Sequence, residues 1–140
     1  MTRIKARREQ IWYNVVMSQK TLLETDRAQA LKLADCVQVA PASIVSRTLV
    51  QSPEARVVLF CFAEGQELSA HCSPRRAFVQ ILAGACSFLF DGRWQRLETG
   101  MFLHLPPGHP HAVKADDGPF SMLLTLGAEL PGPSAPEKGR

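Results

Sequence analysis

From Pro41 onward the chain consists of short apolar runs separated by turn residues. The runs are rich in Val, Ile, Leu and Phe, which suit a pleated surface, and Gly, Pro or Asp-Gly follow most of them. They cover residues 43–51, 55–65, 77–84, 86–92, 101–108, 111–115 and 121–130. Many short strands at regular spacing predict an all-β sandwich or barrel.

The two ends of the chain have a different pattern. Thr21 and Glu24 have capping-box spacing and the following apolar residues have partly helical spacing, which allows a short helix there. The last residues are rich in proline and polar side chains, which cannot continue a strand. We therefore predict a partly helical N-terminal extension over residues 1–26, a barrel over 27–130 and a disordered tail over 131–140.

Size and charge limit the function classes. With 140 residues, 46% of them hydrophobic, the chain is long enough to form one domain with its own core. The net charge of +3 arises in the first twenty residues, which carry five basic side chains and one acidic side chain. The remaining residues carry eleven basic and twelve acidic side chains, so the body of the protein shows no charge pattern for nucleic-acid binding.

The chain also lacks the usual sequence signals for membranes and secretion. No apolar run approaches the roughly 20 residues needed to span a bilayer. The basic start is not followed by the apolar stretch of a secretory signal. These absences predict a cytoplasmic protein without a membrane partner. The cysteines show no C-x-x-C spacing and are expected to be reduced thiols; they are Cys36, Cys61, Cys72 and Cys86.

Two groups of glycine and histidine residues resemble the two motifs of the cupin superfamily. In the first group, Gly65 is followed after five residues by His71, and Gly84 closes the motif. The second group matches its motif at every fixed position and consists of Gly100, Pro106, Gly108 and His111. The resemblance covers about residues 27–130 and implies a double-sheet jelly-roll barrel that pairs as a homodimer.

The first motif departs from the cupin pattern at two ligand positions. Ser73 stands where the family has a second histidine, and Ala77 stands where it has a glutamate. Half of the family's metal-ligand set is therefore absent. The residues around this departure are similar to those of a subgroup of small single-domain, RmlC-like bacterial cupins.

The alternation of strand residues predicts what faces the barrel interior. His71 and Ser73 share one face because side chains alternate along a strand, and Ala77 and Val79 share a face in the next strand. If His71 points inward, as the resemblance implies, the interior is an apolar pocket with few polar groups. Such a pocket suits a small ligand. The expected ligand-binding residues are His71, Ser73, Ala77, His109 and His111.

His71 and His111 are the main candidates for a metal site. Neutral imidazole binds Fe, Mn, Ni or Zn, and two imidazoles from different strands can hold one divalent ion if further donors complete the shell. His109 precedes His111 by two residues and is the candidate third ligand; its alternative role is a rim residue in a turn. The alternative for His71 and His111 is that both are interior histidines bonded to backbone or water.

Other polar residues have simpler interpretations. Gln80 is expected on the outer face because Ala77 and Val79 face inward. His104 lies in a strand whose orientation the sequence leaves open. Arg75 and Arg76 are expected beside the barrel mouth, where they would receive an anionic group or remain solvated.

Three functions are compatible with this pattern. The first is binding of a small molecule in the barrel interior, with or without a weakly held divalent metal at His71 and His111. The second is a metal-dependent dioxygenase or isomerase. The third is a metal-free, epimerase-like enzyme with His71 or His111 as general base; such a base needs a carboxylate partner, and the sequence indicates none.

Overall fold

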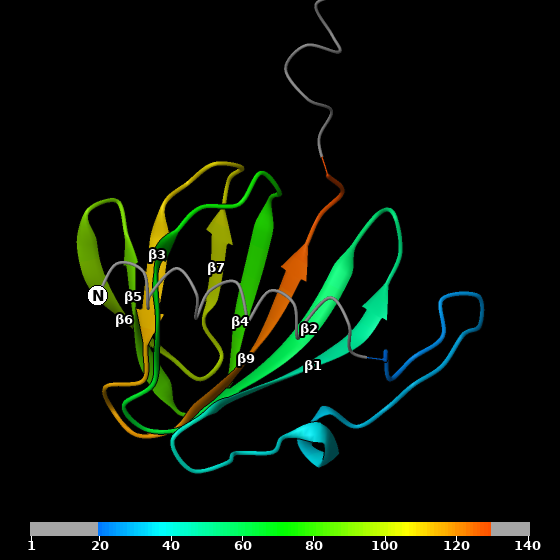
Figure 1. The fold of residues 1–140 in the computed structure, drawn as a ribbon, viewed down its shortest axis with the longest axis horizontal. Coiled ribbons are helices and arrows are strands. Elements are labelled where there is room, and N and C mark those ends of the chain that lie inside the picture. The colour runs from blue at the N-terminus through cyan, green and yellow to red at the C-terminus, as the bar shows by residue number, and fades with distance from the viewer. Residues whose placement is uncertain (1–19, 130–140) are drawn as a thin grey trace, which may run out of the picture.

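The computed structural model describes residues 20–129, and within them the chain forms two antiparallel sheets that face each other (Figure 1). The first sheet has the order β1 (Ile44–Gln51), β2 (Arg56–Phe62), β9 (Phe120–Leu126), β4 (Ala77–Ala83) and β7 (Phe102–Leu105). The second has the order β3 (Glu67–His71), β8 (His111–Lys114), β5 (Ala85–Phe90) and β6 (Arg93–Glu98). The predicted all-β jelly-roll barrel is confirmed.

The core lies between the two sheets, and strand alternation determines which side chains enter it. In β2, Val58, Phe60 and Phe62 face inward, while Phe62 stacks on Phe120 of β9 at a centroid distance of 4.6 Å. Ala77, Val79 and Ile81 of β4 are also buried in this core, as the alternation predicts. Each large side chain that is fully buried contributes about 1.5–3 kcal/mol to folding.

The residues before β1 cover the outer face of the first sheet. Leu22 and Leu23 donate backbone hydrogen bonds to the carbonyls of Thr48 and Leu49 in β1, at 3.0 and 2.7 Å. Their side chains join a second apolar cluster around Leu59 and Cys61 on the outward side of β2. Both faces of β2 are therefore covered, which explains why the strand is apolar over residues 57–62.

The helix allowed by the sequence around Thr21 and Glu24 does not form. The backbone at Leu22 and Leu23 pairs with β1 instead, and the helical structure of this region is one 3₁₀ turn, η1 (Leu33–Cys36). The predicted tail over 131–140 and most of the predicted extension lie outside the described residues. No helix among residues 20–129 is long and apolar enough to cross a membrane.

Two turns show why glycine stands where it does. At Gly84, between β4 and β5, φ is +79° and an added Cβ would lie 2.5 Å from the carbonyl oxygen of Pro119. Between β5 and β6, Asp91 and Gly92 have φ values of 54° and 76°, as a type I′ hairpin turn requires. The motif glycine at 84 is thus required by backbone conformation and by packing.

Candidate functional site

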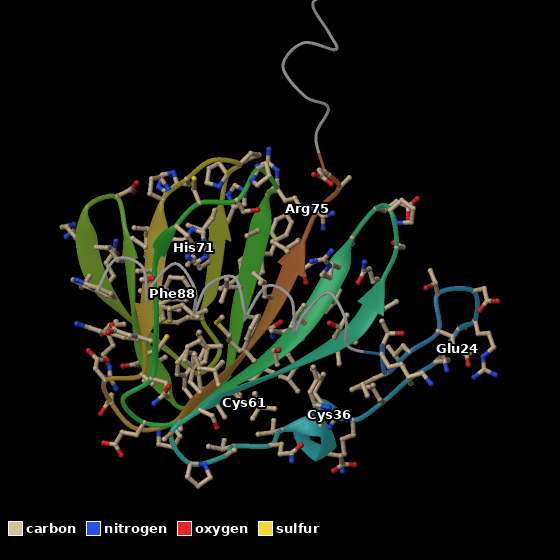
Figure 2. The ribbon with its side chains drawn as sticks, in the orientation of Figure 1. Glu24, Cys36, Cys61, His71, Arg75 and Phe88 are labelled. Carbon is tan, nitrogen blue, oxygen red and sulfur yellow. The ribbon has the colours of Figure 1, made fainter. Side chains whose placement is uncertain are left out.

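A cavity of about 260 Å³ opens at one end of the barrel. Its apolar wall comes from β2, β4 and β9 and consists of Val58, Phe60, Ala77, Leu124 and Leu126. Its polar side chains are Arg56, His71, Ser73, Arg75, His111 and Glu129. Figure 2 shows His71 and Phe88 inside the barrel and Arg75 nearer its open end.

His71 and His111 converge, as their motif positions predict. They lie directly opposite each other in the pairing of β3 with β8, and their ring centroids are 4.4 Å apart at an interplanar angle of 61°. Both rings also border a smaller cavity of about 30 Å³ that Phe88 and Met122 line. The imidazole pair therefore lies between the larger cavity and the core.

Each ring of the pair is held by the main chain two residues before it. His71 Nδ1 lies 2.8 Å from the carbonyl oxygen of Ser69, and His111 Nδ1 lies 2.9 Å from that of His109. A carbonyl oxygen only accepts hydrogen bonds, so both Nδ1 atoms carry the proton and donate. In the neutral ring Nε2 then holds the lone pair, which is the state that accepts a hydrogen bond or binds a metal.

Burial favours the neutral form of His111. Desolvation lowers its pKa from the ordinary value of 6.5, and the nearby His71 and His109 act in the same direction. The hydrogen bond to the His109 carbonyl opposes this shift but does not reverse it. His111 is therefore neutral at physiological pH, with its Nε2 lone pair available.

Ser73 and Ala77 also line the cavity, where the sequence places the two missing ligands. The hydroxyl of Ser73 accepts a hydrogen bond from the backbone N–H of Arg75 at 3.0 Å, and its carbonyl accepts one from Gly108 at 2.7 Å. Ser73 thus ties the β3–β4 loop to the β7–β8 loop. Ala77 is 3% exposed and forms part of the apolar wall.

The other two histidines make contacts elsewhere. His109 Nε2 donates to Asp91 at 2.8 Å, and its side chain is not among those that line the cavity within residues 20–129. His104 is exposed, accepts a hydrogen bond from Arg76 at 2.8 Å and stacks on Phe78. Sequence reasoning had no signal for the His109 contact, because Asp91 lies in a distant hairpin turn.

Two charged residues of the cavity were not identified from the sequence. Arg56 begins β2, faces inward and is 6% exposed. Glu129 follows β9, and its carboxylate lies 3.6 Å from the guanidinium of Arg75. The alternation of Arg56 with Val58 and Phe60 could have identified the first, but the unbroken apolar run from 57 to 62 hides it.

The two thiols near the motifs differ in burial. Cys72 is exposed, follows the inward-facing His71 in the chain and also borders the cavity. Cys86 is buried, and desolvation together with Asp116 raises its pKa to about 12. A thiol that stays protonated is a poor nucleophile, and Cys86 packs as a small apolar side chain.

The side chains present supply an incomplete metal shell. His71 and His111 provide two imidazoles whose Nδ1 atoms are fixed, as in many metal sites. Within residues 20–129, however, no group of three or more His, Cys, Asp or Glu side chains is placed to hold a metal ion. Catalytic zinc normally has three protein ligands, so we assign no reaction step to a metal.

Comparison with known proteins identifies the same fold. A crystal structure of a conserved protein of unknown function from Streptococcus pyogenes has a TM-score of 0.68 and 31% identity, covering 81% of this chain and 99% of that one. A cupin superfamily protein from Desulfitobacterium hafniense has a TM-score of 0.67 and 27% identity, covering 78% of this chain and 99% of that one.

One curated relative is named as an enzyme. Dimethylsulfoniopropionate lyase DddQ of Ruegeria pomeroyi is 38% identical over 61 residues, which are 43% of this chain and 30% of the lyase. The chain therefore matches less than a third of that enzyme's length.

The family comparison covers the strands that build the site. The sequence profile described as "Cupin domain" matches residues 58–126, which run from β2 to the end of β9 and include both histidines of the pair. Together with the two facing sheets and the similar structures, this match shows that the chain belongs to the cupin superfamily.

Proposed function

We propose that this cupin binds a small molecule in the cavity at the open end of its barrel. The observation that carries the proposal is a largely apolar cavity of about 260 Å³ with two oriented imidazoles at its inner end. Ligand sites are typically concave and mostly apolar, with a few polar groups that fix orientation. The volume lies near the lower limit of that class, about 300 Å³, so the ligand is small.

The imidazole pair can accept a hydrogen bond from a ligand that carries a donor group. Both Nδ1–H groups are bonded to the main chain, so Nε2 is the nitrogen of each ring that can contact a ligand. Nε2 of a neutral ring accepts a hydrogen bond from an O–H or N–H group. A divalent ion held weakly by the same two atoms, with ligand and water completing its shell, stays a secondary proposal.

The binding proposal is tested by filling the cavity. Ala77→Phe places a ring in the cavity wall, whereas Gln80→Phe places the same ring on the exposed face of the same strand. We expect short alcohols, amides and carboxylates to shift the NMR resonances of the His71 and His111 rings in wild type and in Gln80→Phe, but not in Ala77→Phe. Equal shifts in the two variants would show that the probes bind outside the cavity.

A second candidate is an enzyme that removes a proton from its substrate. The observation that favours it is His111, whose pKa is lowered by burial and whose Nε2 is therefore free to act as a base. The partial similarity to a dimethylsulfoniopropionate lyase suggests the first compound to test. Its consumption would be followed by proton NMR, with and without added Mn, Fe, Ni or Zn, in wild type and in His111→Gln. Turnover lost in His111→Gln would favour this candidate.

The assembly and location of the protein remain predictions. A homodimer is implied by the resemblance to small cupins, and sedimentation velocity measures it directly. A cytoplasmic location rests on the sequence alone, and cell fractionation tests it.

A further inference from the structure

The described part of the cavity lining carries more positive than negative side chains. Arg56 and Arg75 line it together with Glu129, while the two imidazoles contribute no charge when neutral. Guanidinium groups stay protonated in proteins, so neither arginine can lose its charge on burial. Among residues 20–129, the charged side chains of the lining are therefore two positive and one negative.

Arg56 is positioned by the strand pattern of the barrel wall. It begins β2 and pairs with Leu126 of β9, which in turn pairs with Ala77 of β4, so these three residues form one row at the open end of the sheet. Arg56 is 6% exposed and its neighbours along the wall are apolar. Arg56 has interactions of its own, so it supplies positive potential beside an apolar wall rather than an open binding group.

Glu129 shows where a carboxylate meets the cavity. Its carboxylate lies 3.6 Å from the Arg75 guanidinium, which is beyond ordinary hydrogen-bond length. The Arg75 side chain is 20% exposed, whereas that of Glu129 is 68% exposed. An ion pair with one partner so open to water is weak, and a ligand carboxylate can replace it.

We propose that the cavity takes a small carboxylate with an apolar stem, whose carboxylate group binds Arg75 in place of Glu129. Arg56 attracts the anion from within the wall, and the stem lies against Val58, Leu124 and Leu126. This inference rests on the proposed ligand-binding function and names its ligand class. Glu129 competes with the ligand, so its removal strengthens binding.

Hexanoate and hexanamide are matched probes for isothermal titration calorimetry, since they share a stem and differ in charge. We expect hexanoate to bind more tightly than hexanamide. Arg75→Gln should weaken hexanoate binding about tenfold or more, as for the loss of a charge-assisted hydrogen bond. Glu129→Gln should strengthen it about two- to fivefold, as for the removal of an exposed ion pair. The adjacent Arg76 pairs with His104 outside the cavity, so Arg76→Gln should leave binding unchanged.

The outcomes separate this inference from the function on which it rests. Equal binding of hexanoate and hexanamide, or equal loss in Arg75→Gln and Arg76→Gln, would overturn the carboxylate proposal while the cavity remained a binding site. Inorganic phosphate that binds as tightly as hexanoate would also overturn it, because the apolar stem would then contribute nothing. Failure of both hexanoate and hexanamide to bind would contradict the carboxylate proposal, and failure of the whole probe panel in the cavity would contradict the binding function as well.

Discussion

Two substitutions should turn the histidine pair into a divalent-metal site. Ser73→His and Ala77→Glu introduce the two ligands that the first cupin motif lacks, and both positions line the same cavity as His71 and His111. Three imidazoles and a carboxylate form a ligand set that suits Mn, Fe, Ni or Zn. We expect the double variant to be less stable than wild type without metal and to be markedly stabilised by metal.

The sizes of the destabilisation and of the gain from metal follow from the burial and hydrogen bonding of the two positions and from typical energies. Ala77 is 3% exposed, and an ionised carboxylate placed in that apolar wall costs several kcal/mol. Ser73→His also removes the hydroxyl that accepts from the Arg75 N–H, which costs about 0.5–1.5 kcal/mol. At a free metal concentration of about 100 times Kd, binding to the folded state returns about 2.7 kcal/mol. For a domain of roughly 110 residues this gain corresponds to a rise in Tm of about 10 °C.

The assay compares thermal melts of chelated protein with and without the ion. Wild type, the double variant and the double variant carrying His111→Ala are measured at the same metal concentration. The third protein should lose most of the gain, because it lacks one of the four ligands. If metal raises the Tm of wild type as much as that of the double variant, the wild-type site already binds metal fully. The interpretation of Ser73 and Ala77 as missing-ligand positions is then wrong.

Three further predictions concern stability. Gly84→Ala should lower the free energy of unfolding, measured by urea denaturation, more than Gly92→Ala does. Both residues have positive φ, which costs an alanine about 1–2 kcal/mol, but only at Gly84 does the new Cβ meet backbone. Equal losses in the two variants would contradict this prediction. Because the folded-state pKa of His111 lies below 6.5, the unfolded chain binds more protons between these two values. Stability should therefore be fully present above pH 6.5 and fall as the pH falls through this window, with a smaller slope in His111→Gln; an unchanged slope would assign the effect to other groups. Removal of residues 1–16 should leave Tm unchanged, whereas removal up to residue 24 should lower it, because Leu22 and Leu23 bond to β1; a lower Tm in the shorter deletion would assign a structural role to the first residues.

The fold and the central pair were predictable because they depend on local spacing. His71 and His111 occupy fixed motif positions, and the period of two along a strand then places Val79 inside and Gln80 outside, as observed. These features need no knowledge of which distant segments meet.

The remaining features depend on contacts between segments far apart in the sequence. The inward position of Arg56 is hidden because the N-terminal residues cover the other face of β2 and make that strand apolar throughout. The carboxylate of Glu129 reaches the cavity only through the path of the chain after β9. The short helix predicted near Thr21 gives way to pairing with β1, because tertiary contacts override a weak local preference.

The bonds from Nδ1 to the carbonyls of Ser69 and His109 have a consequence for protein engineering. The hydrogen bonds that orient the two imidazoles run to main-chain carbonyls, one within β3 and one just before β8, and the rings also contact each other. Residues of the cavity wall such as Ala77 or Leu124 can therefore be exchanged to reshape the pocket while the two rings keep their orientation. Ligand preference and histidine geometry are separately adjustable in this barrel, and a library confined to the wall would vary the first alone.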